Sequence, residues 1–205
     1  MKKVFVFAAA IVLSASVALA SVKPGEKSEL KVDTKSSKVY WTGKKVTGEH
    51  TGFVMIEEGS VVLNNGKLDG AVIKMDMSTI ESTDMQGEWK DKLDGHLKSD
   101  DFFSVEKHPI ATFKVKSVDN SGTKSSIKGD LTIKGITHEV EFPVQTKMVD
   151  GTLTASGTAK LDRTKWDIRF RSGKFFTDLG DNLIYDEFEV KFDLVAKSAE
   201  ELTSL

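Results

Sequence analysis

Cysteine is absent from all 205 residues of the chain. This absence excludes a disulfide framework and a lipid-modified N-terminal cysteine. The four histidines, His50, His96, His108 and His138, show no spacing typical of a metal site, and no cysteine is present to support them. We therefore expect no metal centre and no resident cofactor other than a bound lipid, for which the reasons follow.

An excess of positive charge is also missing, because 29 basic residues stand against 31 acidic ones and the net charge is −2. This balance gives no electrostatic reason to expect binding to nucleic acid or to an anionic membrane surface. The chain also lacks a GxSxG elbow, an HExxH helix, a phosphate-binding glycine loop and a dinucleotide fingerprint. We expect a binding protein without catalytic residues.

The first twenty residues have the order of a secretory signal peptide. Lys2 and Lys3 precede an apolar run, and Ala18 and Ala20 place small side chains at the cleavage site. The apolar run is short for a membrane-spanning helix, and a polar segment follows it at once. We predict cleavage after Ala20 and a periplasmic or secreted protein.

The remaining segment, 21–205, suits one domain with a substantial hydrophobic core. It contains no internal linker, repeat or low-complexity tract. Loss of Lys2 and Lys3 leaves 27 basic and 31 acidic residues, so the mature chain carries a net charge of −4.

Most of this domain alternates between apolar and polar residues with a period of two, which predicts strands that have one apolar face. The clearest segments are 71–77, 111–118, 127–133, 139–145 and 187–196. Turn signals separate several of them, at Asn65-Gly66, Lys134-Gly135 and Asp150-Gly151. The pattern predicts an antiparallel sheet with one buried side, either a sandwich or a closed barrel, and periodicity does not choose between these two.

One segment, 82–103, breaks the alternation. Ser82, Thr83 and Asp84 offer capping oxygens, and apolar residues then recur at a spacing of four, which predicts a helix that ends near Gly95. A second short helical turn is expected from Ser99. One or two short helices are therefore predicted within 84–103.

Three segments resemble the YceI-like, polyisoprenoid-binding family: HLKSDDFFSVEKHPIATF at 96–113, GDLTIKGITHEVEFPV at 129–144 and DRTKWDIRF at 162–170. The similarity runs in order from about Lys31 to Lys197. It implies an all-β, lipocalin-like, up-and-down antiparallel barrel of about eight strands, which holds a long-chain isoprenoid or similar amphiphile in an apolar lumen. One position departs from the family, since Asp167 follows Trp166 where the family usually has glycine.

The resemblance implies which side chains surround the ligand. Barrels of about eight strands are just wide enough to be filled by side chains or to hold one small ligand. Inward strand positions and the apolar residues of the helical insert are the candidates: Trp41, Phe53, Met55, Ile73, Met75, Met77, Trp89, Leu93, Leu97, Phe102, Phe103, Phe113, Val115, Phe142 and Trp166. Any one of these positions is also compatible with ordinary core packing.

Three polar residues are candidates for contact with a lipid head group. The only arginines of the chain lie within nine residues of one another, and arginine suits phosphate because its donors form a planar fork. This makes Arg163 and Arg169 candidates, and His96 is a third because it flanks the helical insert. A solvated strand or loop is the simpler explanation of the same residues.

Two further functions stay open at this stage. An enzyme acting on an isoprenoid lipid would need a pair of polar groups inside the barrel. An interaction protein would have a filled barrel or a broad exposed apolar patch. A homodimer that covers an apolar barrel mouth is also expected if that mouth is exposed.

Overall fold

The computed structural model describes residues 27–120 and 125–203. The predicted signal peptide and its cleavage site lie outside the described residues. The elements, in chain order, are β1 (Lys27–Val32), β2 (Lys38–Lys45), β3 (Gly48–Asn64), β4 (Lys67–Ser82), α1 (Gly87–Lys98), β5 (Ile110–Asp119), β6 (Ser125–Ile133), β7 (Ile136–Val149), β8 (Thr152–Asp162), the short 3-10 helices η1 (Arg163–Trp166) and η2 (Gly180–Asn182), β9 (Ile184–Lys197) and α2 (Ala199–Thr203).

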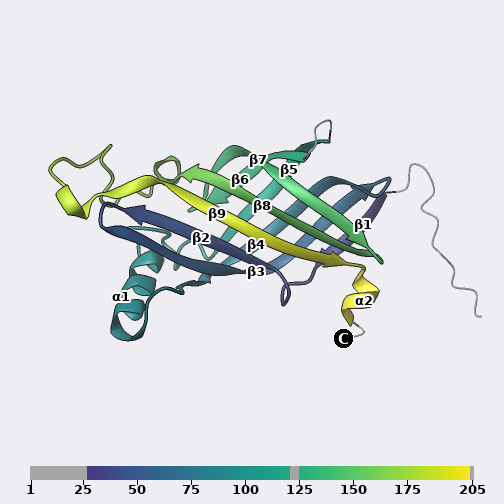
Figure 1. The fold of residues 1–205 in the computed structure, drawn as a ribbon, viewed down its shortest axis with the longest axis horizontal. Helices are drawn as coiled ribbons and strands as arrows, with labels where there is room; N and C mark the ends of the chain where they lie inside the picture. The colour runs from purple at the N-terminus through teal and green to yellow at the C-terminus, as the bar shows by residue number, and fades with distance from the viewer. Residues whose placement is uncertain (1–26, 121–124, 204–205) are drawn as a thin grey trace, which may run out of the picture.

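The strands close into an antiparallel barrel (Figure 1). From β2 the order runs through β9, β8, β7, β6, β5 and β4 to β3, and β3 pairs with β2 to complete the ring. Strand β1 pairs with the far end of β3 and the last residues of β9, so β1 and β2 together fill one position. The prediction of a barrel with about eight strands is confirmed.

Tight turns set the register of three hairpins. In each, both central residues have a positive φ: 54° and 74° at Asn65 and Gly66, 50° and 72° at Lys134 and Gly135, and 47° and 78° at Asp150 and Gly151. Two successive positive φ values are the signature of the type I′ turn, whose twist matches that of paired strands. The turns expected from the sequence at these three places are confirmed.

The prediction of one or two short helices in this segment is confirmed by one helix, α1, but the start and end of that helix and the chain after it differ from the expectation. Helix α1 begins at Gly87 after Gln86, which makes no side-chain capping bond, and it continues past Gly95 to Lys98. Asp84 does not cap the helix, because its carboxylate accepts hydrogen bonds from His50 and from the backbone N–H of Thr51 on β3. The chain from Ser99 to His108 forms turns in place of a second helix.

The two ends of the barrel carry different elements. Helix α1 and the loop that contains η2 lie at one end, and α2 lies at the other (Figure 1). Lys90 anchors α1 to the end of β4, because its ammonium group donates to the carbonyl of Ser82 and to Asp94, which in turn accepts from the backbone N–H of Ser82. None of the helices in 27–120 and 125–203 combines the length and the apolar character needed to cross a bilayer.

Candidate functional site

The barrel contains a cavity of about 150 Å³. Its wall takes side chains from all of the strands β2 to β9 and one from the turn after α1, and every lining side chain is hydrophobic. Alternation along the strands explains this wall, since each strand turns every second residue inward and the inward set is apolar. An apolar cavity of about this size stays dry and accepts an apolar guest such as benzene.

The cavity wall includes eight of the residues expected to surround a ligand. They come from strands β2, β4, β5 and β7 and from the turn after α1: Trp41, Ile73, Met75, Met77, Phe103, Phe113, Val115 and Phe142. Two aromatic contacts order part of this wall, because the ring of Phe142 lies 5.3 Å from that of Phe113 and 5.6 Å from that of Phe192.

Phe53 and Met55 do not line the cavity, and their prediction as lumen residues is wrong. Their partners on β4 are Glu81 and Asp76, which places both side chains on the outer face of the sheet. Lys38 covers the Phe53 ring at 4.6 Å. The inward residues of this stretch are Val54 and Ile56, which are buried.

Three of the other expected wall residues have different surroundings. Trp89 is 68% exposed on α1, where the ammonium group of Lys92 lies 4.9 Å from its ring. Leu93 packs against the core without reaching the cavity. Trp166 is fully buried beside the barrel end, where its indole N–H donates to the carbonyl of Leu131 at 3.2 Å. None of the three lines the cavity.

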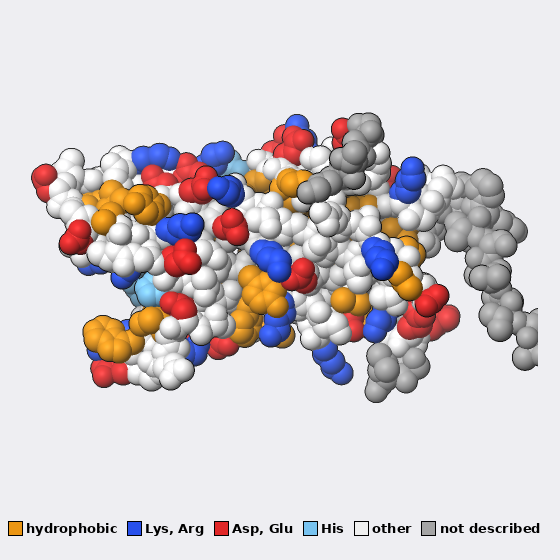
Figure 2. All heavy atoms as spheres, in the orientation of Figure 1, with side chains coloured by type: hydrophobic (Ala, Val, Ile, Leu, Met, Phe, Trp, Pro, Cys, Tyr) orange, Lys and Arg blue, Asp and Glu red, His pale blue; other side chains and the backbone are white. Residues whose placement is uncertain are grey.

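A second cavity of about 70 Å³ adjoins the first, and Trp41, Phe103 and Phe188 line both. Leu97 and Phe102 of the helical insert, both expected near the ligand, belong to this smaller cavity. It lies at the end of the barrel that carries α1, where Figure 2 shows the surface hollowed between α1 and the loop that contains η2. The rest of the wall of this smaller cavity comes from β2, η1 and β9 and from Ile168.

Strands β8 and β9 supply wall residues that the sequence reading omitted. Phe188, Val190, Phe192 and Leu194 line the larger cavity from β9, and Ala155, Ala159 and Leu161 line it from β8. The β9 residues lie on the apolar face of the segment 187–196, so the alternation already indicated them. The alanines gave no such signal, because small residues mark a cavity only once their neighbours are known.

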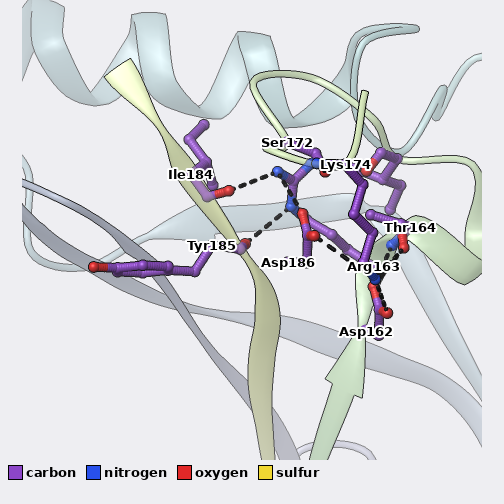
Figure 3. A network of polar contacts seen from close by, with 9 residues as sticks. Asp162, Arg163, Thr164, Ser172, Lys174, Ile184, Tyr185 and Asp186 are labelled. Atoms are coloured by element: carbon purple, nitrogen blue, oxygen red, sulfur yellow. Dashed lines mark hydrogen bonds and ion pairs between the residues drawn. The ribbon is translucent and has the colours of Figure 1, made fainter. Parts of the chain in front are cut away.

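Arg163, a candidate for contact with the head group, lines the second cavity, but its side chain is hydrogen-bonded to the protein backbone. Its side chain is buried, and its three nitrogens donate to the carbonyls of Tyr185, Ile168 and Ile184 at 3.1, 2.7 and 3.0 Å (Figure 3). Burial lowers the pKa of Arg163, and the nearby carboxylate of Asp186, 3.5 Å from a guanidinium nitrogen, opposes this shift. Arg163 therefore ties the end of β8 to the start of β9, and each of its three nitrogens already donates one hydrogen bond.

The other two head-group candidates lie at the surface. Arg169 pairs with Asp167 at 2.5 Å and covers the ring of Phe175 at 4.8 Å. His96 contacts Asp101 at 3.1 Å, and the ring of Phe170 lies 4.5 Å from its own. Neither residue lines either cavity. Among the described residues, no group of three or more His, Cys, Asp or Glu side chains has the arrangement of a metal site.

Asp167 has a backbone conformation that explains its place in the sequence. It ends η1 with φ 58° and ψ 31°, in the left-handed region. Glycine adopts this conformation at the least cost, and aspartate and asparagine are the side chains that tolerate it best. The carboxylate in place of glycine keeps the bend of the chain and points to Arg169 at the surface.

Comparison with known proteins agrees with this architecture. The model of the YceI-like domain family matches residues 30–196. The chain belongs to the YceI-like family. A UPF0312 protein of Staphylococcus aureus strain bovine RF122 / ET3-1 is 40% identical over 87 residues, which cover 39% of this chain and 48% of that relative. In strain N315 the identity is 50% over 52 residues, 25% of this chain and 28% of the relative. The matched part therefore spans about half or less of these relatives.

Solved structures with low sequence identity share the fold of this YceI-like chain. BcnA of Burkholderia cenocepacia has a TM-score of 0.62 at 23% identity, over 80% of this chain and 98% of BcnA. A polyisoprenoid binding domain from Saccharophagus degradans has a TM-score of 0.58 at 14% identity, over 82% of this chain and 98% of that domain.

Proposed function

We propose that the protein binds and carries a long-chain isoprenoid or similar amphiphilic lipid in the lumen of its barrel. The observation that carries this proposal is the larger cavity, whose wall is hydrophobic throughout and extends over all eight barrel positions. The structural likeness to a polyisoprenoid binding domain supports an isoprenoid as the ligand class.

Burial of the chain supplies the affinity in this proposal. Each methylene group moved from water into the lumen contributes about 0.8 kcal/mol before the cost of ordering the chain is subtracted. The cavity of about 150 Å³ is small for a chain of many isoprene units, so the wall must widen when such a chain enters. Met75 and Met77 line the cavity, and methionine side chains adapt their shape readily because they are unbranched.

Two alternatives receive less support. An enzyme would need reactive polar groups in the lumen, and the wall of the larger cavity contains no titratable side chain. An interaction protein with a filled barrel would need no cavity of this size. A carrier needs only the apolar lumen and a route into it.

We further propose that the chain is exported to the periplasm or beyond and that cleavage follows Ala20. The intact mass of exported protein is expected to match a chain that starts at Ser21. A homodimer stays a prediction as well, supported by exposed aromatic side chains such as Phe175 and Phe176. Light scattering on the purified protein tests it.

The binding proposal is tested by titration calorimetry with geranylgeraniol and with the hydrocarbon of the same tail. Both ligands are expected to bind, with a negative heat-capacity change that reports burial of apolar surface. Met75→Lys, which places a charge in the lumen, is expected to abolish binding, whereas Arg169→Ala leaves it unchanged. Equal binding by wild type and a folded Met75→Lys variant would exclude the lumen as the site.

A further inference from the structure

Trp41 of β2 lies where the two cavities meet, because it lines both of them. A ligand whose chain fills the larger cavity and whose remaining part extends under α1 must pass this indole ring. Trp41 is therefore placed to contact the part of the ligand at which the tail ends.

The ring of Trp41 lies against the backbone of β3 at a position where that strand has a glycine. Gly52 is the partner of Trp41 on β3, and a Cβ at Gly52 would lie 2.5 Å from Cζ2 and 2.7 Å from Cε2 of the indole. The same Cβ would lie 1.9 Å from the carbonyl oxygen of Glu81 on β4. No side chain fits there, so the glycine lets the indole lie directly on the strand backbone.

The indole N–H of Trp41 is buried and has no hydrogen-bond partner among the described residues. Such groups are rare in native proteins, because a buried donor without an acceptor loses its bond to water and gains none in return. The other buried indole, that of Trp166, does have an acceptor, the carbonyl of Leu131. The unpaired donor at the junction of the two cavities points to an acceptor that the ligand supplies.

The surroundings of Trp41 favour a neutral acceptor over an anion. The wall of the second cavity contains one cation, Arg163, and its nitrogens already donate to three carbonyls and face Asp186. A phosphate group at this depth would lose its hydration, and the one cation of this wall already faces a carboxylate. Burial of an anion without a compensating cation is costly in apolar surroundings. A ketone, ester or ether oxygen needs only one donor.

We infer that the indole N–H of Trp41 donates a hydrogen bond to a neutral acceptor oxygen, of the carbonyl or ether class, on the bound lipid. The inference rests on the proposed function and adds the chemical class of the ligand's polar group. The tail occupies the larger cavity, and the polar group lies at the junction below α1.

The indole N–H signals of the wild-type protein test this contact directly. The chain has three tryptophans, so a nitrogen–proton correlation spectrum shows three such signals, which single Trp→Phe variants assign. The probes are farnesylacetone, the hydrocarbon with a methylene in place of its carbonyl, and farnesyl phosphate. With farnesylacetone the Trp41 proton is expected to move downfield, while the Trp166 signal stays, and the hydrocarbon is expected to cause no downfield movement.

Affinity provides the second measurement. Trp41→Phe keeps an aromatic ring and removes the donor, so binding of farnesylacetone is expected to weaken about fivefold while binding of the hydrocarbon does not change. Phe103→Leu is the matched control, since Phe103 lines both cavities without a polar group, and it should affect both ligands alike. Farnesyl phosphate is expected to bind more weakly than the ketone.

The outcomes separate this inference from the proposed function. If the ketone and the hydrocarbon both bind tightly, shift the Trp41 signal alike and respond alike to Trp41→Phe, the proposed hydrogen bond is overturned. The lumen would then still be a lipid site. Tighter binding of farnesyl phosphate than of the ketone would overturn the neutral class. Failure of all three probes to bind would overturn the proposed function and this inference together. If Trp41→Phe does not fold, the spectra of the wild-type protein still decide.

Discussion

Trp166 and Trp41 are both large indole side chains of the barrel, yet their surroundings differ. Trp166 is fully buried and its N–H is bonded to Leu131, beside an Arg163 whose nitrogens are all engaged. Trp41 lines two cavities and its N–H has no partner among the described residues. The region around η1 is connected by hydrogen bonds, and its one buried oxygen without a hydrogen-bond partner, Oδ1 of Asp186, lies 3.5 Å from the guanidinium group of Arg163, whereas the lumen wall keeps space and an uncompensated donor. Unfilled space of this kind indicates a ligand-binding site.

The largest expected effect is a loss of stability on replacing Arg163, in the hydrogen-bonded region around η1. Arg163→Met removes the donors to three carbonyls and leaves Asp186 with only the more exposed Lys174 as a cationic partner, so we expect the free energy of unfolding to fall by about 3–5 kcal/mol. Arg169→Met is the control, because Arg169 lies at the surface with one exposed partner, and a change within about 0.5 kcal/mol is expected. Urea unfolding measures both. If the free energy of unfolding falls by less than about 1 kcal/mol in Arg163→Met, the connection between β8 and β9 depends on other contacts.

A pair of methionines on the two faces of the barrel sharpens the comparison. Met75→Lys places an ammonium group among apolar side chains and is expected to destabilise the protein by about 3 kcal/mol and to abolish lipid binding. Met55→Lys places the same group on the outer face, where we expect a change within about 0.5 kcal/mol and normal binding. Thermal unfolding and a lipid titration measure the two effects. Similar losses in both variants would show that the assigned faces are wrong.

Filling the lumen should affect stability and binding in opposite directions. Ala159→Leu projects into the larger cavity, so the unliganded protein is expected to gain about 0.5–2 kcal/mol while lipid affinity falls at least tenfold. Ala196→Leu is the control, because Ala196 is buried without lining either cavity, and it should lose stability through overpacking. If Ala159→Leu is destabilised as much as Ala196→Leu, the cavity has no free space for the added atoms.

The smallest expected effect concerns the anchor of α1 and depends on pH. Burial raises the pKa of Asp94, but hydrogen bonds from Lys90 and Ser82 outweigh it and leave the pKa below its ordinary value. A lowered pKa in the folded state stabilises the protein above the unfolded value of about 3.9, and this contribution is lost as the pH falls through the folded pKa. Asp94→Asn is expected to cost about 1 kcal/mol at pH 7 and less at pH 3. Asp91→Asn, an exposed change on the same helix, is the control, and a change within about 0.5 kcal/mol at pH 7 is expected.

Local patterns in the sequence predicted the strands, the three tight turns and most of the inward faces, whereas the choice of a barrel over a sandwich came from the resemblance to the YceI-like family. Residues 53–56 are all hydrophobic, so a period of two could not choose the face, and the partners on β4 decided it. The role of Arg163 depends on backbone carbonyls at Ile184 and Tyr185, about twenty residues later in the chain, which no local pattern contains. The helix start was wrong because Asp84 bonds across to β3.

Organic extracts of the purified protein test the central claim most directly. Wild type and Ala159→Leu are expressed and purified side by side, and mass spectrometry quantifies the lipid released from each. We expect a long-chain isoprenoid or similar amphiphile at close to one molecule per wild-type chain, and much less from the folded variant with the filled lumen. Extracts without any such lipid from wild type, or equal amounts from both proteins, would contradict a lipid site in the lumen.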